Sequence, residues 1–431
     1  MDLLLYVPLI VLVLMVVRLE WGMALFVIYS FCLPVKSIII GPLSLPYNLF
    51  FIAMFLAAMR LKTGKSWKQR TKPLTPFIWL YMALLLLMPF AGSNQPIVNQ
   101  FRWWVSDLLP SLAVPFAIWN LYLVDRNRLR VIIWALFMAI VIAIGYGLFV
   151  ASLGGANPYL SLLLPMVGGE FNEYYAFERD DGRLFGRVSS VFVHPMTFGL
   201  FTSLSFWFVF YYFHPADNRK KVVCMSFFLL PITIMTLVSG VRSTIVGVLI
   251  GLIIYVYMNK PGAQLKTALL LLFVGLVIMN VNEKLGDYVL SIFNSGAAKD
   301  VSGSSLGLRL KQLYGCFNII ESNMLLGMGY RWNNFYQNVY GDHPQVLAFE
   351  SLLFVVLCSW GIIGVVIWTM FSAKVVTLLR KEFGARSIPI ITLFFIYIGY
   401  SLVTGEYFYM QYFVIFYILM YCVYFQRNLE I

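Results

Sequence analysis

The sequence predicts an all-α polytopic membrane protein, and three observations lead to this fold class. Of the 431 residues, 61% are apolar and only 12% are charged, whereas soluble domains carry about twice that charged fraction. The mean hydropathy is +0.82. Apolar runs of roughly 15 to 20 residues recur along the whole chain, and a helix of that length crosses the hydrocarbon core of a bilayer. Because backbone groups in that core must pair within the chain, we expect a bundle of about 12–13 transmembrane helices and no large soluble enzyme domain.

The apolar runs give the candidate spans in order. They are 3–17, 21–35, 45–59, 76–92, 104–123, 131–153, 188–213, 222–238, 243–258, 267–281, 346–370, 388–404 and 408–425. The spans divide the chain into N-terminal transmembrane helices in 1–153, a first long loop in 154–187, central transmembrane helices in 188–281, a large loop in 282–345 and C-terminal transmembrane helices in 346–431.

The charge pattern predicts the orientation of these spans. The net charge is +12, and basic residues concentrate in 60–72, 126–130, 219–221 and 374–386, which alternate so that all four loops fall on one side. Because Lys and Arg favour cytoplasmic loops, this side is predicted to be the cytoplasm, and the excess charge indicates orientation rather than nucleic-acid binding. The two long loops are then extracytoplasmic. In the second, apolar residues from Leu306 to Ile320 recur with helical spacing, which predicts a short amphipathic helix.

Arginines are unusually frequent on the predicted outer side, at positions 102, 179, 183, 187, 242, 309 and 331. Arg187 and Arg242 lie at the mouths of spans, where an unpaired charge is costly. One explanation is that loop carboxylates pair with some of these arginines. For Arg187, Arg242 and Arg309 we favour anion binding, because a guanidinium matches phosphate oxygens in pairs and several together could hold a diphosphate at the membrane surface.

A histidine in the large loop is the best candidate for a general base. His343, in the segment GDHPQ, has an unperturbed pKa near 6.5 that suits proton abstraction at neutral pH, although a hydrogen-bonded loop histidine is the alternative. Asp342 and Glu350 could orient its ring or contact a sugar hydroxyl. His194, at the start of a span, could orient a neighbouring group or simply bond to backbone. Aromatic side chains of the outer loops, such as Tyr330 beside Arg331, could stack on sugar rings.

Motifs for other chemistry do not occur. The chain has no Walker loop, no GxGxxG after a strand, no HExxH, no GxSxG and no His/Cys metal spacing. The five cysteines are scattered and indicate neither a metal site nor a disulfide framework. We therefore expect no cofactor and no metal ion.

Four segments in this order resemble the O-antigen polymerase and ligase superfamily. GRVSSVFVHPMTFG resembles its Arg-to-Gly motif before a span, and SGVRSTIVG resembles its second Arg at the outer mouth of a span. SSLGLRLKQLYGCFNIIESNMLLGMGY resembles the third Arg followed by a helix and a Pro-Leu-Gly-x-Gly-like turn. DHPQVLAFESLLFVVLCSWGIIG resembles the catalytic-loop His followed by a span with Gly-Ile-Ile-Gly. The resemblance covers about residues 183–370, and the N-terminal half shares only hydropathy.

The resemblance implies a metal-independent, inverting glycosyltransferase with a membrane bundle like those of the GT-C class. Its donor would be a glycan on undecaprenyl diphosphate, bound by Arg187, Arg242 and Arg309, and His343 would be the base. His194 is the reserve candidate, because Pro344 follows His343 where the family commonly has a small polar residue. The implied location is a bacterial inner membrane, with the active site facing the periplasm. Membrane lipid, and other polysaccharide-assembly proteins, are its expected partners.

The sequence leaves the acceptor open. The first interpretation is a polysaccharide polymerase, whose acceptor is a lipid-linked repeat unit. The alternative is an O-antigen ligase, whose acceptor is a lipid A core. A flippase or transporter for a lipid-linked glycan is disfavoured, because the charges cluster at the outer mouths of spans rather than at mid-membrane. A noncatalytic membrane scaffold would leave the outer arginines unexplained.

Overall fold

The computed structural model describes residues 3–33, 37–40, 43–154, 156–166, 187–214, 219–259, 306–405 and 409–429. Within these residues the protein is a bundle of helices, with one short antiparallel hairpin that the hydropathy did not predict. The candidate span 267–281, most of the first long loop and residues 282–305 of the second lie outside the described residues.

The elements follow the chain in this order. They are α1 (Leu3–Val17), α2 (Leu19–Cys32), β1 (Ser37–Ile40), β2 (Leu43–Pro46), α3 (Asn48–Met59), α4 (Trp67–Arg70), η1 (Lys72–Leu74), α5 (Thr75–Leu87), η2 (Met88–Phe90), α6 (Ile97–Val124), α7 (Arg126–Ser152), α8 (Pro158–Met166), α10 (Pro195–Phe213), α11 (Arg219–Val238), α12 (Arg242–Asn259), α15 (Leu306–Ile319), η4 (Glu321–Asn323), α16 (Trp332–Tyr340), α17 (Leu352–Phe383), η5 (Gly384–Ser387), α18 (Ile388–Thr404) and α19 (Tyr409–Leu429).

The length and apolarity of these helices confirm the predicted polytopic membrane class. In the described chain, 7 helical segments are long and apolar enough to cross a membrane. They are Lys72–Phe90, Ile97–Val124, Arg126–Ser152, Pro195–Phe213, Arg219–Val238, Leu352–Thr404, which contains both α17 and α18, and Tyr409–Asn428. Shorter apolar helices add Tyr6–Val17, Leu19–Cys32, Asn48–Met59 and Ser243–Met258. The chain is therefore a multi-pass membrane protein.

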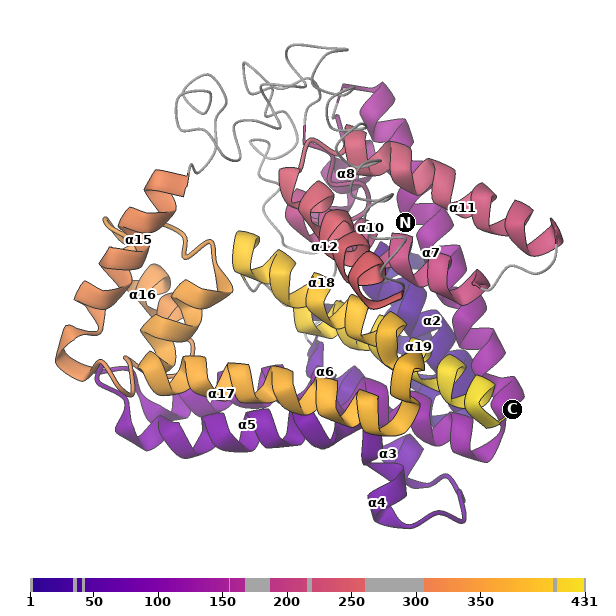
Figure 1. Ribbon diagram of the computed structural model, residues 1–431, viewed down its shortest axis with the longest axis horizontal. Coiled ribbons are helices and arrows are strands. Elements are labelled where there is room, and N and C mark those ends of the chain that lie inside the picture. The colour runs from indigo at the N-terminus through magenta and orange to yellow at the C-terminus, as the bar shows by residue number, and fades with distance from the viewer. Residues whose placement is uncertain are drawn as a thin grey trace.

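Three helices in the centre of the bundle pack closely through small residues. Along α10, Gly199, Ser203 and Trp207 face Thr244, Gly247 and Gly251 of α12 in that order, so the two helices run parallel. Helix α18 is antiparallel to them. Tyr400 near its C-terminal end contacts Gly199 near the start of α10, whereas Thr392 near its N-terminal end bonds to Tyr211 near the end of α10. Figure 1 shows α18 beside α12. The C-terminal end of α18 therefore meets the N-terminal ends of α10 and α12.

Polar contacts of basic residues fix the opposite end of this bundle. Arg427, near the end of α19, donates to the carbonyl oxygens of Tyr212 and His214 at the C-terminal end of α10. Lys72 pairs with Glu382 at the end of α17. Carbonyl groups in the last turn of a helix need hydrogen-bond partners from outside the helix. A cation at that end also interacts favourably with the negative end of the helix dipole.

Helix α17 is interrupted at Gly361, where the backbone has φ 61° and ψ −155°. The loop 324–329 lies against this break. Met328 N and Gly329 N donate to the carbonyl oxygens of Cys358 and Ser359 at 2.8 and 2.9 Å. In return, the amides of 362 and 363 donate to the carbonyl oxygens of 324 and 325, both at 3.1 Å. The loop thus pairs backbone groups that the break frees, as a break in a membrane helix requires.

The predicted consequence is that Gly361→Ala destabilises the fold. A Cβ on Gly361 would overlap the carbonyl oxygen of Met324, and this φ/ψ region is essentially restricted to glycine. We expect the free energy of unfolding, measured with denaturant in detergent, to fall by about 3 kcal/mol or more. Gly145→Ala in α7 is the matched control, because its Cβ would have nothing within 4 Å in the described chain beyond its neighbouring residues and the backbone of its own helix, and it should gain up to about 1 kcal/mol. Equal effects of the two substitutions would contradict the role assigned to the break.

Candidate functional site

Two of the predicted diphosphate arginines, Arg187 before α10 and Arg242 at the start of α12, lie in segments that contact each other. Arg187 is followed by Val188, whose amide donates to the carbonyl oxygen of Ser239 at 3.0 Å. Ser239 lies in the turn between α11 and α12, and α12 begins at Arg242. The side chain of Arg242 is outside the described part of the structure. The backbone alone brings both positions to the end of the bundle where α10 and α12 begin.

Arg309 reaches the same end from α15. Its guanidinium Nη2 donates to the carbonyl oxygen of Val403 at 2.6 Å, and Nη1 donates to the carbonyl oxygen of Glu350 at 3.4 Å. Val403 is in the last turn of α18, where carbonyl groups need partners from outside the helix. The structure therefore brings the three arginine positions to one end of the unit formed by α10, α12 and α18. The bonds of Arg309 also give it a structural role there.

His194 caps the N-terminus of α10. Its Nδ1 accepts from the amide of Met196 at 3.1 Å. Burial, together with the nearby charge of Arg187, lowers its pKa to about 4. The ring is therefore neutral at pH 7, and because Nδ1 is an acceptor, the proton is on Nε2. These features agree with the bond to backbone that the sequence analysis gave as one alternative for this residue.

His343 lies in the segment between α16 and α17, against the rings of Tyr336 and Phe349. Its Nδ1 accepts from the amides of Gln345 at 3.1 Å and Val346 at 3.3 Å. Burial lowers the pKa of the ring below its usual 6.5. The neutral ring then carries its proton on Nε2, which makes Nε2 a donor in this conformation.

The two acidic candidates near His343 differ in their environment. Asp342 is exposed, whereas Glu350 is half-buried. The backbone carbonyl of Glu350 accepts from Arg309. The chain from His343 to Glu350 therefore connects the candidate base to the arginine end of the bundle.

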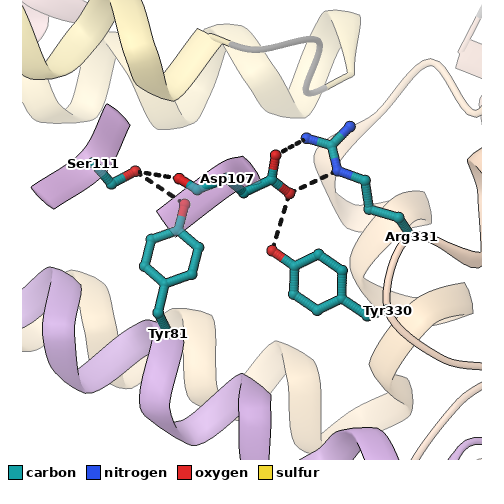
Figure 2. Close-up of polar contacts among 5 residues, drawn as sticks. All are labelled: Tyr81, Asp107, Ser111, Tyr330 and Arg331. Carbon is teal, nitrogen blue, oxygen red and sulfur yellow. Dashed lines mark hydrogen bonds and ion pairs between the residues drawn. The ribbon is translucent and has the colours of Figure 1, made fainter. Parts of the chain in front are cut away.

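A buried ion pair is the second polar centre of the structure (Figure 2). The guanidinium of Arg331 bonds in a bidentate manner to Asp107 of α6, with Nε to Oδ2 and Nη2 to Oδ1 both at 2.7 Å. Tyr330 donates its hydroxyl to Asp107 Oδ2 at 3.0 Å. The side chains of Arg331 and Asp107 are only 11% and 13% exposed. Trp103 covers the guanidinium, with its ring centroid 5.5 Å from Cζ.

Neighbouring amides hold this pair in place. The backbone amide of Tyr330 donates to Oε1 of Gln100 at 2.9 Å, and its carbonyl oxygen accepts from Nε2 of Gln95 at 3.0 Å. Arg331 has a left-handed backbone with φ 50°, which is uncommon for a side chain of this size. The two bonds of Tyr330, directly before this residue, oppose its relaxation.

Sequence reasoning did not include Asp107 among the site residues. The signal was present, because Asp107 is an acidic residue inside the predicted span 104–123, and an ionisable residue in a span is a functional candidate. Its partner could not be named, since Tyr330 and Arg331 lie more than 220 residues away in the chain.

A pocket opens beside this ion pair. It has a volume of about 60 Å³ and lies between α5, α6, α16, α17 and α19. The lining residues are Leu80, Tyr81, Leu84, Asp107, Pro110, Tyr330, Arg331, Asn333, Asn334, Leu352, Val355, Trp360, Trp368, Met410 and Gln411. Within the described residues, no group of three or more His, Cys, Asp or Glu side chains could hold a metal ion.

Comparison with known families identifies one part of the chain. Residues 226–369, roughly a third of the chain, are similar to the family model described as O-Antigen ligase. The matched segment contains Arg242, Arg309 and His343, but neither Arg187 nor Asp107. The match confirms the resemblance predicted for this region. A search of curated proteins found no match to the chain.

The buried pair gives a prediction about stability. Asp107→Ala and Arg331→Ala should each lower the free energy of unfolding by about 3–5 kcal/mol, because each leaves a buried charge without its partner. The double variant should lose clearly less than the sum of the two, as measured by denaturant unfolding in detergent. Lys72→Ala with Glu382→Ala provides the control cycle, because Lys72 is 36% exposed and the expected coupling is below about 1 kcal/mol. Additive losses at Asp107 and Arg331 would contradict the prediction.

Proposed function

We propose that this protein is a glycosyltransferase that moves a glycan from undecaprenyl diphosphate to a sugar hydroxyl of a lipid-linked repeat unit, on the periplasmic face of a bacterial inner membrane. The observation that carries the proposal is the meeting of Arg187, Arg242 and Arg309 at one end of α10, α12 and α18. The O-Antigen ligase match over 226–369 supports a glycan-transferring enzyme with a lipid-linked substrate.

The proposed role of the arginines is electrostatic. When the bond between the anomeric carbon and the phosphate breaks, negative charge grows on the leaving diphosphate. Guanidinium groups placed in advance stabilise that charge without reorganising during the step. The contacts of Arg309 with Val403 and Glu350 support such placement, because they restrict the side chain before a substrate arrives.

In the proposed reaction, His343 accepts the proton of the acceptor hydroxyl as that oxygen attacks the anomeric carbon, which inverts the centre. The described conformation adds a condition to this role. Because Nδ1 accepts two backbone N–H bonds and Nε2 carries the proton, one ring nitrogen must be released before the ring can act as a base. A movement of the segment that follows His343 would release Nδ1.

A ligase is the second candidate. It would use the same donor and the same arginines, and would transfer the glycan to a lipid A core. The description of the matched family as O-Antigen ligase favours it. The two candidates differ in the acceptor alone, so an assay with defined acceptors separates them.

The test is a reconstituted reaction with purified protein and a lipid-diphosphate-linked repeat unit, analysed on a gel. A ladder of products is the expected result, and Arg187→Ala, Arg242→Ala and Arg309→Ala should each reduce its rate by about 100-fold or more. Transfer that requires an added lipid A core would indicate a ligase, and no glycosidic bond with either acceptor would indicate a transporter.

Arg427→Ala is the matched control for the arginine variants. Like Arg309, Arg427 donates to carbonyl oxygens at the C-terminal end of a helix, but at the opposite end of the bundle. It should share any loss of stability while keeping the rate per folded molecule. Full activity in the three arginine variants would exclude the proposed diphosphate site.

Two asparagine substitutions separate catalysis from capping. An Asn side chain can accept backbone N–H bonds as a cap but cannot take up a proton. His343→Asn should therefore keep the fold and lower kcat by about 100-fold or more, whereas His194→Asn should retain activity within about threefold. An active His343→Asn enzyme would exclude the base role.

The pH profile provides a second measurement on these variants. The base form of His343 is the unprotonated ring, and burial lowers its pKa below 6.5. In the wild type, kcat/KM should therefore rise with pH below 6.5 and level off above it. This rising limb should be absent from the residual activity of His343→Asn and unchanged in His194→Asn.

A further inference from the structure

The segment between α3 and α5 forms a closed loop rich in basic residues. We call residues 60–70 the basic loop, which contains no Asp or Glu. Its cations are Arg60, Lys62, Lys65, Lys68 and Arg70. Nη2 of Arg70 donates to the carbonyl oxygen of Ala58 in the last turn of α3 at 2.9 Å, so the two ends of the loop meet. The positive charges are therefore gathered in one compact segment.

Arg70 anchors the basic loop to the bundle. Its Nε donates to Oδ1 of Asn120 at 2.6 Å, and Nδ2 of the buried Asn120 donates to the carbonyl oxygen of Arg70 at 3.2 Å. Nε1 of Trp119 donates to the carbonyl oxygen of Gln69 at 2.8 Å. Both Asn120 and Trp119 belong to α6, which is long and apolar enough to span a membrane. The loop is therefore held in place before it meets a partner, which lowers the ordering cost of binding.

The other four cations of the basic loop are exposed. They are Arg60, Lys62, Lys65 and Lys68, and none of them forms an ion pair with another described residue. Trp67, beside Lys68 in α4, is 55% exposed. Figure 1 shows α4 protruding from the bundle beyond α5 and α17. The protruding surface is therefore positively charged and carries an exposed aromatic ring.

The basic loop connects two apolar helices. Asn48–Met59 precedes it, and the candidate span Lys72–Phe90 follows it almost directly. Lys72 pairs with Glu382 at the end of α17, so the loop is at the end of the bundle opposite Arg309. Residues that connect two membrane helices lie near the level of the lipid headgroups, and Trp is enriched at that level.

We propose that the basic loop is a docking surface for anionic phospholipids, whose headgroup phosphates its four exposed cations bind. Clusters of four or more Lys or Arg directly beside a membrane helix are typical of such binding, and each cation adds about fivefold in affinity. A lipid is favoured over a soluble acidic partner, because the loop is held between two membrane helices, where headgroups surround it, and Trp67 lies among the cations. The inference does not depend on the proposed function.

The first experiment locates the lipid contact residue by residue. The full-length protein is placed in nanodiscs of phosphatidylcholine, either alone or mixed with phosphatidylglycerol, and the acylation rate of each lysine by a water-soluble reagent is measured by peptide mass spectrometry. Phosphatidylglycerol should slow the acylation of Lys62, Lys65 and Lys68 about fivefold more than that of Lys221. Lys221 is the control, because it is also exposed and α11 begins after the end of α10 that Arg427 contacts, on the same face of the bundle.

Two results of this experiment would overturn the docking surface. Equal slowing at the loop lysines and at Lys221 would mean that the negative lipid surface acts on all exposed cations alike. Unchanged rates at Lys62, Lys65 and Lys68 would mean that the loop does not meet the lipid. In about 0.5 M salt the difference between the loop and Lys221 should disappear, because salt screens contacts between exposed charges.

The second experiment measures affinity with variants of equal charge. The protein in a neutral detergent is titrated with phosphatidylglycerol or phosphatidylcholine, and the bound lipids are counted by native mass spectrometry. Replacing Lys62, Lys65 and Lys68 together by Gln should weaken at least one phosphatidylglycerol binding step about 100-fold and leave phosphatidylcholine binding unchanged.

The control variant replaces Arg219, Lys220 and Lys221 together by Gln, which removes the same charge from the same face. Three consecutive residues of a helix point in different directions, so these cations do not converge on one headgroup and their loss should cost less than about tenfold. Equal losses in the two variants would show that net charge alone attracts the lipid, and would contradict the docking surface.

Discussion

The pairing of the loop 324–329 with the break in α17 is the contact on which the polar part of the structure depends. A helix interrupted inside a membrane leaves N–H and C=O groups that water cannot satisfy, so some other backbone must supply partners. Here the loop bonds on both sides of Gly361, to residues 358 and 359 before it and to 362 and 363 after it. The loop cannot move without exposing those groups. Since Tyr330 and Arg331 follow directly, the broken helix determines where the guanidinium of Arg331 meets Asp107.

Two arginines near the predicted outer side, Arg331 and Arg309, are held in different ways. Arg331 is matched by a carboxylate in a bidentate pair, an arrangement that compensates the cost of burying its charge. Arg309 is oriented by the carbonyl oxygens of Val403 and Glu350, which are dipoles rather than full charges. Carbonyl groups at a helix C-terminus attract a cation. The two side chains are therefore oriented by different kinds of contact, a carboxylate for Arg331 and backbone carbonyl groups for Arg309.

Sequence reasoning predicted the parts of this fold that depend on hydropathy and missed those that depend on contacts between distant residues. The spans could be predicted because the length of an apolar run is a local property of the sequence. The helix predicted over 188–213 begins later, at Pro195, because His194 caps it and the residues before it form turns. The amphipathic helix expected after Leu306 is α15. The pairing of Asp107 with Arg331 was not predictable, since it joins α6 to a loop more than 220 residues away. The sequence also does not specify which ring nitrogen of His343 accepts hydrogen bonds from backbone amides.

The two polar centres are connected through the short segments that flank α18. Residues 350–352 contact the end of α18 through the bonds of Glu350 and Ser351, and Leu352 lines the pocket. His343 begins the same stretch of chain, and its Nδ1 bonds tie it to residues 345 and 346. A substrate that displaced Glu350 or Ser351 would therefore act on both centres and on the histidine together. In the proposed reaction, such a displacement would release the His343 ring when the lipid diphosphate occupies the helix end.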